Sequence, residues 1–259
     1  MLSRNLTNVE QLTIYMNECK RMGINVLGPD INESMLQFSA NKQGDVRFGL
    51  AAIKGVGEAA VESIIAERTK NGRFKDIYDF IERVDYSLVN RKCLENIAYA
   101  GGYDSISGFS RCKFFGVDQR DNNGVTYIEQ LMRYGQRYQS EKNNAQQSLF
   151  GGDTGTTDIT PPVIPACAEW SQLEKLNKER EVIGLYLSAH PLDDYKVIIR
   201  NMCKTQVGDL DHLDELKGKE IAVAGMVVAV QNLTAHVVRN YDFNCFPPAG
   251  GKWYEESSQ

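Results

Sequence analysis

The chain has 259 residues and a formal net charge of -5, from 29 Lys+Arg and 34 Asp+Glu. Its hydrophobic content of 42% and charged content of 24% are typical of a globular protein and exclude a wholly disordered or collagen-like chain. The longest apolar run, residues 221–230, is about half the ~20 residues that a membrane-spanning helix needs, so we expect no membrane partner.

The cysteine pattern predicts a reduced, cytoplasmic protein with buried thiols. No two cysteines are spaced as C-x-x-C and no histidine stands at zinc-ligand spacing, so we expect no metal in this chain. The amino terminus leads into polar residues without a signal-peptide core. The mild acidity excludes a globally basic nucleic-acid coat but allows a local basic patch. The six cysteines are Cys19, Cys93, Cys112, Cys167, Cys203 and Cys245.

The first predicted element is a helix over about residues 7–24, with an apolar side that includes Leu12 and an end at Gly23. Residues 26–30 follow, of which Pro29 and Asp30 are turn-like. Residues 46–104 alternate short helical patterns with glycines.

Residues 50–65 contain the most informative short motif, in which Gly55-Val56-Gly57 separates two apolar segments. This pattern is typical of a helix-hairpin-helix, because the glycines allow a tight turn and the close approach of another molecule. The free N–H groups at the start of the second helix suit a phosphate. Lys54 stands just before the turn, and residues 42–75 hold seven Lys/Arg against four Asp/Glu. The motif therefore predicts binding to a nucleic-acid backbone without sequence readout.

Two other interpretations of this motif remain open. The glycines can form a plain turn between helices, with Val56 as its hydrophobic plug. The string Gly55-x-Gly57-x-x-Ala60 also fits a dinucleotide-binding fingerprint. That fingerprint needs a strand on either side and an acid about 20 residues later, and residues 74–83 favour a helix instead.

A second glycine-centred unit follows at residues 90–104, where a predicted helix ends in Gly101 and Gly102. It resembles a degenerate second hairpin that braces the first. Arg91 and Lys92 are candidate phosphate contacts, although an ordinary solvated helix face explains them equally well.

Residues 126–139 predict one amphipathic helix, and a short apolar motif follows it. Leu149 and Phe150 are adjacent apolar residues at the edge of a glycine-rich stretch, so they suit docking into the pocket of a partner. Their burial there contributes roughly 1.5–3 kcal/mol each. Gln146 supplies an amide for a hydrogen bond at the rim of such a pocket. The alternative is that Leu149 and Phe150 pack back on the preceding helix.

The remaining chain predicts a linker, a helix and a strand. Residues 151–168 are first rich in glycine and then in proline, which is typical of a linker. A helix over residues 170–189 ends before His190-Pro191, and the β-branched run at 219–230 favours a buried strand. The histidines are expected to be structural, because no Ser or Cys is arranged beside them for nucleophilic catalysis.

In combination, stretches along the chain resemble the alpha subunit of bacterial DNA polymerase III, a replicative polymerase. Residues 15–24 and 28–34 resemble the end of that family's fingers region, and residues 47–57 its helix-hairpin-helix. The resemblance covers about residues 5–232. The further matching stretches are residues 72–85, 94–104, 146–150, 181–192 and 218–228.

The resemblance implies a role in DNA replication. The hairpin would hold double-stranded primer-template DNA through Lys54, Gly55, Val56 and Gly57, aided by Arg91 and Lys92. The stretch 146–150 resembles the motif by which these polymerases bind the sliding clamp, with Gln146, Leu149 and Phe150 as the contacts. Other replicase subunits are further expected partners. Residues 218–228 resemble the first strand of the family's OB domain, which we expect to be incomplete here with a divergent tail.

The resemblance also implies that this chain lacks catalysis of its own. The family is a DNA-directed DNA polymerase, a nucleotidyltransferase whose palm, upstream of these segments, carries aspartates for magnesium. No segment here matches that palm, so we expect a carboxyl-side piece without catalytic residues or a cofactor. Asp76, Asp79 and Asp85 are interpreted as surface charges.

The expected fold is mainly α in its amino-terminal part, with tandem helix-hairpin-helix units, then a linker and a small α+β part with an incomplete OB-like domain. A stand-alone helix-hairpin-helix DNA-repair protein is the alternative, though no matching catalytic Asp or Lys is evident. A purely structural piece is the third interpretation. The expected boundaries are 1–44 for the fingers-like segment, 45–150 for the hairpin and clamp-binding domain, 151–168 for the linker, 169–217 for a helical segment and 218–259 for the OB-like part.

Overall fold

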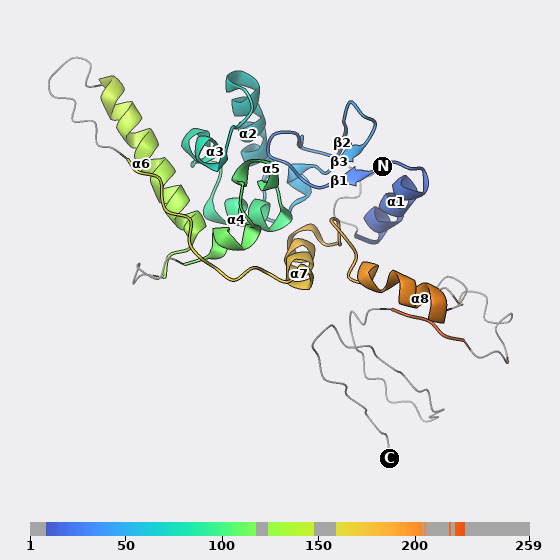
Figure 1. Cartoon of the computed structure of the whole chain (residues 1–259). Helices are drawn as coiled ribbons and strands as arrows, with labels where there is room; N and C mark the ends of the chain where they lie inside the picture. Colours follow the sequence, from blue (N-terminus) through green and yellow to red (C-terminus); the bar gives the residue numbers. More distant parts are fainter. Residues whose placement is uncertain are drawn as a thin grey trace, which may run out of the picture. The chain divides into compact units, whose positions relative to one another are not determined.

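The computed structural model describes residues 9–117, 124–147, 159–203, 205, 218 and 221–225. The chain divides into two compact units, Met1–Lys196 and Val197–Gln259. The first unit is mainly helical and holds most of the described secondary structure (Figure 1).

Helices form most of the described secondary structure of the first unit. Those before the hairpin and around it are α1 Val9–Arg21, the 3-10 helix η2 Leu50–Ala52, α2 Glu58–Asn71, α3 Ile77–Arg83 and α4 Arg91–Ala100. Those after it are α5 Asp104–Ser107, the 3-10 helix η3 Arg111–Phe115, α6 Tyr127–Gln147, α7 Gln172–Ile183 and the 3-10 helix η5 Asp193–Tyr195.

A three-stranded sheet lies between α1 and the hairpin. Its strands are β1 Val26–Leu27, β2 Ser39–Ala40 and β3 Val46–Arg47, in the order β1-β3-β2. β1 is parallel to β3 and β2 is antiparallel to it. β1 ends before the turn-like Pro29 and Asp30, and the sequence did not predict this strand, because two-residue strands are too short to show the alternation that marks a strand.

Local signals explain where the central helices begin and end. The Asp76 carboxylate accepts from the Asp79 amide at the start of α3, and the Asn90 side chain accepts from the Cys93 amide at the start of α4. Gly101 ends α4 in the left-handed conformation, with φ of +84°. The buried faces of α2, α3, α4 and α6 share one hydrophobic core, which includes Val61, Phe80, Leu94, Ile97 and Leu131.

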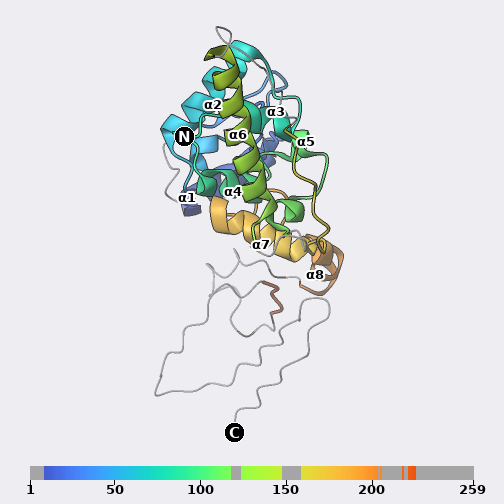
Figure 2. The same ribbon diagram turned by 90° about the vertical axis from the view of Figure 1, so that its left-hand side faces the viewer.

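Helix α6 runs along the outside of this core and is longer than the 14 residues expected for it (Figures 1 and 2). Gly135 allows it to approach α3 closely. A Cβ atom at Gly135 would lie 2.5 Å from the Ile81 carbonyl oxygen and 2.1 Å from the Tyr86 hydroxyl oxygen. The Tyr86 hydroxyl itself donates to that carbonyl at 2.7 Å.

Residues 159–171, here called the strap, connect back to α7. The strap runs beside α6 in an extended conformation, and its Pro162 carbonyl accepts from the Tyr127 hydroxyl at 3.4 Å. A Cβ atom at Gly116 would lie 2.9 Å from the Pro165 ring, so the strap packs closely on the segment after η3. The strap ends at Ser171, which forms a capping box with Glu174 and starts α7.

Helix α7 is shorter than the predicted 170–189. It ends at Gly184, with φ of +91°, and the chain then folds back along the helix. The cause is Glu179, whose buried carboxylate accepts from the Leu187 amide at 2.9 Å and the Ser188 amide at 2.7 Å. The Leu187 and Ser188 amides thus donate to the Glu179 side chain, whereas in a longer helix they would donate to backbone carbonyls.

The second unit contains most of α8, Lys196–Met202, and little else that the structure describes. Residues 221–225, which the sequence placed in a buried strand, have no regular secondary structure and four of the five are exposed. A strand needs a paired neighbour, and no described residue pairs with them. The other residues of the expected OB-like part lie outside the described residues, apart from Gly218.

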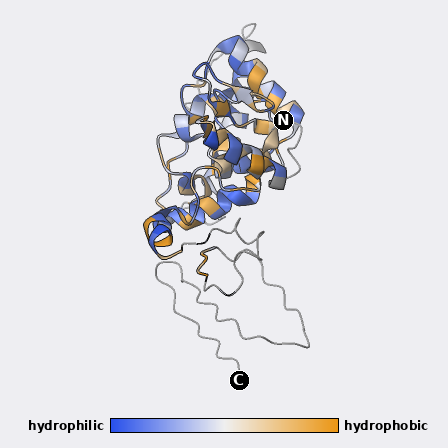
Figure 3. Cartoon of the chain, turned by 90° about the vertical axis from the view of Figure 1, so that its right-hand side faces the viewer, coloured by the Kyte–Doolittle hydropathy of each residue, from blue (hydrophilic) through white to orange (hydrophobic). Residues whose placement is uncertain are grey.

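Hydrophilic and hydrophobic residues alternate along the helices (Figure 3). In the described part of the chain, no helix combines the length and the apolar character that crossing a membrane requires.

Candidate nucleic-acid interface

The predicted hairpin consists of η2, a five-residue turn and α2. Ile53 and Val56 are buried and anchor the turn in the core, and the Val56 amide donates to the Ile53 carbonyl at 3.1 Å. Gly55 has φ of +75°, a conformation that residues with a Cβ atom rarely adopt. The apolar plug and the glycine turn therefore form as the sequence predicted.

The outer side of the turn is open. Lys54, Gly55 and Gly57 are exposed, and a Cβ atom at Gly57 would meet nothing within 4 Å. Gly57 is the N-cap of α2 and no side chain caps the helix there. The first amides of α2 thus point outward without a protein acceptor in the described part of the chain, and they carry the partial positive charge of the helix terminus.

The backbone of Lys54 is held from two sides. Its amide donates to the Val182 carbonyl of α7 at 2.8 Å, and its carbonyl accepts from the Asn96 side-chain amide of α4 at 2.5 Å. A Cβ atom at Gly55 would lie 2.9 Å from the same Asn96 nitrogen. The sequence suggested that the second glycine-centred unit, residues 90–104, braces the hairpin. It gave no indication of the contacts that Asn96 and Val182 make with the Lys54 backbone.

Three cationic side chains were predicted to contact phosphate. Lys54 and Lys92 flank the turn, whereas Arg91 already forms ion pairs. The stem of Lys92 lies against Gly55, with its Cγ and Cε atoms 3.9 and 3.8 Å from a Cβ atom built there. Neither Lys54 nor Lys92 has an ion pair within the described ranges. Arg91, by contrast, bonds to Glu95 at 2.7 Å and also to Glu129. The hydrogen bond that Arg91 donates to Glu95 is the main cause that raises the pKa of Arg91.

The second glycine turn is filled by the protein itself. A Cβ atom at Gly101 would lie 2.0 Å from a terminal nitrogen of Arg111, whose guanidinium covers the turn. Arg111 is buried and bonds to both carboxylate oxygens of Asp104, to Glu179 at 3.2 Å and to the Tyr99 carbonyl. Sequence reasoning missed this role, because Arg111 stands outside the glycine unit.

The dinucleotide-binding interpretation does not fit this geometry. A 3-10 helix, and not a strand, directly precedes the glycines, and α2 leads to α3 instead of a second strand.

Comparisons with known proteins agree with the hairpin geometry and extend it. A family model described as a helix-hairpin-helix motif matches residues 23–114. The DNA polymerase III subunit alpha of Neisseria meningitidis serogroup B is 36% identical over 233 residues, which is 90% of this chain and 18% of that protein. The subunit of Vibrio cholerae is 30% identical over 234 residues, 90% of this chain and 19% of its own length.

The chain is similar to DNA polymerase III alpha subunits along about 90% of its length. The resemblance found in the sequence is therefore confirmed, since the aligned region accounts for nearly all of the chain. The chain spans about a fifth of the length of these relatives. Within the aligned region, the helix-hairpin-helix is the part for which sequence, structure and family model coincide.

The predicted clamp-binding residues lie largely outside the described residues. The backbone of Gln146 belongs to the last turn of α6, whereas Leu149 and Phe150 follow the last described residue of that helix.

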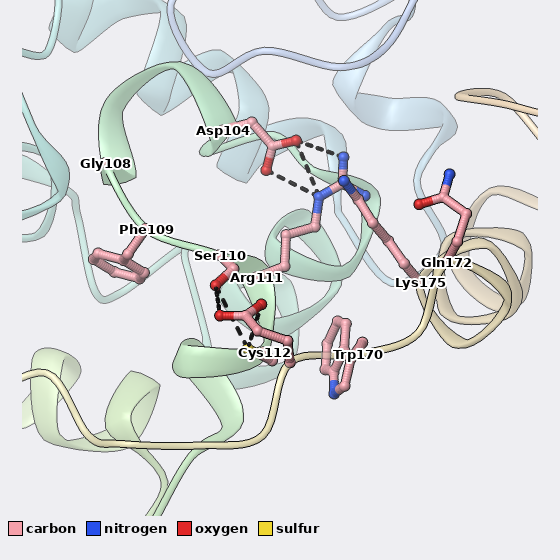
Figure 4. A pocket seen from close by; sticks show the side chains of 10 residues that line it. Asp104, Gly108, Phe109, Ser110, Arg111, Cys112, Trp170, Gln172 and Lys175 are labelled. Atoms are coloured by element: carbon pink, nitrogen blue, oxygen red, sulfur yellow. Dashed lines mark hydrogen bonds and ion pairs between the residues drawn. The ribbon is translucent and has the colours of Figure 1, made fainter.

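A cavity of about 480 Å³ opens beside η3 (Figure 4). Asp104, Ser110 and Arg111 lie on one side, and Trp170 and Lys175 on the other. Arg111 faces Asp104 rather than open space, so its charge is already balanced.

The described residues contain no group of three or more His, Cys, Asp or Glu able to hold a metal ion. The three aspartates near the hairpin have local structural partners. Asp76 caps α3, Asp79 pairs with Arg83 at 2.9 Å, and Asp85 accepts from Ser87.

Proposed function

We propose that this chain is part of a replicative DNA polymerase and holds duplex DNA by its phosphates at Lys54–Gly57. The observation that carries the proposal is the exposed, uncapped amino end of α2 beside Lys54 and Lys92, which have no ion pair in the described part of the chain. A phosphate there would accept hydrogen bonds from backbone amides in the favourable field of the helix terminus. Such contacts position DNA without reading its sequence.

The rigidity of the turn supports this role. A phosphate-binding loop must hold its amides in one arrangement before the ligand arrives, and here α4 and α7 fix both polar groups of the Lys54 backbone. Arg91 contributes less than the sequence suggested, because two glutamates already compete for its guanidinium. Of the two tandem glycine-centred units, the second, at residues 90–104, supports the hairpin. The hairpin itself contacts DNA.

A salt titration of duplex binding tests the proposal. Each lost phosphate contact lowers the slope of log affinity against log salt by about 0.9, so Lys54→Ala, Lys92→Ala should lower it by up to about 2. The matched control is Lys42→Ala, Lys70→Ala, which removes the same charge from exposed sites away from the turn. An equal loss in the control, or wild-type affinity that does not respond to salt, would contradict binding at the hairpin.

We further propose that Gln146, Leu149 and Phe150 tether the polymerase to the sliding clamp. The support is the sequence motif and its place at the end of α6. Binding of the chain to a purified bacterial clamp should be lost in Leu149→Ala, Phe150→Ala. The control Val163→Ala, Ile164→Ala changes an adjacent apolar pair of the strap, which is exposed, and should bind normally. Equal binding by both double variants would refute the tether.

The polymerase reaction itself belongs to the intact protein in this proposal. Magnesium and the catalytic aspartates are expected in a palm domain, and a polymerase assay of this chain alone should show no nucleotide incorporation. The OB-like part after residue 217 remains a prediction of the sequence.

A further inference from the structure

Two free cysteines lie in contact although they are 55 positions apart in the sequence. Cys112 belongs to η3 and Cys167 to the strap, and the Cys167 thiol donates to the Cys112 sulfur at 3.1 Å. Cys112 is buried, whereas Cys167 is half-buried. A disulfide has its sulfurs about 2.05 Å apart, so a movement of about 1 Å would join them.

Several neighbouring contacts hold the two segments in this arrangement. The Ser110 hydroxyl donates to Glu169 at 2.5 Å, and the Cys112 thiol lies 3.5 Å from the same carboxylate (Figure 4). A Cβ atom at Gly116 would lie 3.4 Å from the Cys167 Cβ atom. The Phe115 and Trp170 rings stack with centroids 5.6 Å apart. Contacts on both sides of the cysteine pair thus fix the strap on η3, and the closeness of the sulfurs does not depend on one side chain alone.

We propose that Cys112 and Cys167 are a redox pair that a small disulfide such as glutathione disulfide converts to a reversible protein disulfide. Disulfides that form in reducing compartments are usually transient and redox-sensing. The bond would tie the strap to η3 and close a loop of 55 residues that contains α6.

The chemistry balances as two thiol–disulfide exchanges. The Cys167 thiolate attacks glutathione disulfide, forms a mixed disulfide and releases one glutathione thiolate. The Cys112 thiolate then attacks the Cys167 sulfur and releases the second glutathione. The two cysteine thiols lose two protons and two electrons, and one glutathione disulfide becomes two glutathione molecules.

The surroundings make this pair slow to react at neutral pH. Burial, the Cys112 thiol and the Glu169 carboxylate raise the pKa of Cys167 to about 11, and Lys113 opposes them. Because the thiolate is the nucleophile, the rate of oxidation should rise about tenfold per pH unit between pH 7 and pH 9.

A peptide map after oxidation tests the proposal directly. The folded chain is incubated with excess glutathione disulfide, its free thiols are alkylated, and the non-reduced digest is analysed by mass spectrometry. We expect a cross-linked peptide joining Cys112 to Cys167, which dithiothreitol separates. It should be absent from Cys112→Ser and Cys167→Ser and unchanged in Cys19→Ser, a half-exposed cysteine of α1.

Thermal unfolding gives a second measurement. A disulfide that closes a 55-residue loop should raise the Tm by roughly 5–15 °C in the wild type and in Cys19→Ser, but not in the other two variants. Glutathione adducts without the cross-link, cross-links to other cysteines, or no reaction of either thiol at pH 9 would each overturn the proposal.

Discussion

At the scale of single residues, the two hairpin glycines have different reasons to be glycine. Gly55 has φ of +75° and faces Asn96, whereas Gly57 has φ of −76° and faces open space. Gly55→Ala should therefore lower the free energy of unfolding by roughly 1–3 kcal/mol, and Gly57→Ala by less than about 1 kcal/mol. Urea unfolding measures both. If Gly57→Ala keeps its stability yet loses duplex affinity, the exposed backbone at Gly57 contacts DNA, whereas equal destabilisation by both variants would contradict this assignment.

Glu179 is the second residue whose environment allows a sharp prediction. Its buried carboxylate accepts from Arg111, from the Leu187 and Ser188 amides and from the Ser188 hydroxyl. Glu179→Ala removes the acceptor of these four bonds and takes from the buried Arg111 one of its two carboxylate partners, so the free energy of unfolding should fall by roughly 3–5 kcal/mol. Glu181→Ala, on the exposed side of the same helix, should change it by less than about 0.5 kcal/mol. A comparable loss in both variants would show that α7 itself, and not the Glu179 network, is sensitive.

At the scale of elements, helix α6 depends on one close approach to α3. Alanine is usually better than glycine inside a helix by about 1 kcal/mol. At Gly135, however, the added methyl group would overlap the Ile81 carbonyl and the Tyr86 hydroxyl. Gly135→Ala should therefore lower the free energy of unfolding by about 1–3 kcal/mol in a denaturant titration. Gln136→Ala is the control on the exposed face, and a stabilising Gly135→Ala would mean that the helices can separate at no cost.

The elements also show what the sequence could predict. The turn at Gly55 and Gly57 was predictable, because its glycines and its apolar plug are local in the chain. The braces were not, because Asn96 reaches Lys54 across 42 residues and Val182 lies beyond the strap. The end of α7 was misplaced for the same reason, since Glu179 bonds to amides that a helical pattern assigns to the helix itself.

For the molecule as a whole, paired carboxylates make stability depend on acid pH. Burial acts against the charged form of Glu67, but hydrogen bonds from Arg83 at 2.9 Å and Asn71 at 2.8 Å outweigh it and lower its pKa. Arg47 and Arg73 lower the pKa of Glu33 against burial in the same way. The folded chain thus binds fewer protons than the unfolded chain near the ordinary pKa of glutamate, about 4.3. This stabilisation is complete above that pH and is lost as the pH falls through the lowered folded-state pKa.

Unfolding in urea at a series of pH values between 7 and 3 measures this dependence. We expect the free energy of unfolding of the wild type to fall below about pH 4.5. Glu67→Gln should be less stable than the wild type at pH 7 and should lose less on acidification, because it no longer carries the carboxylate whose protonation matters. Glu62→Gln, an exposed change on the same helix α2, is the matched control and should follow the wild type. If Glu67→Gln and the wild type had parallel profiles, the bond from Arg83 to Glu67 would not couple protonation to folding.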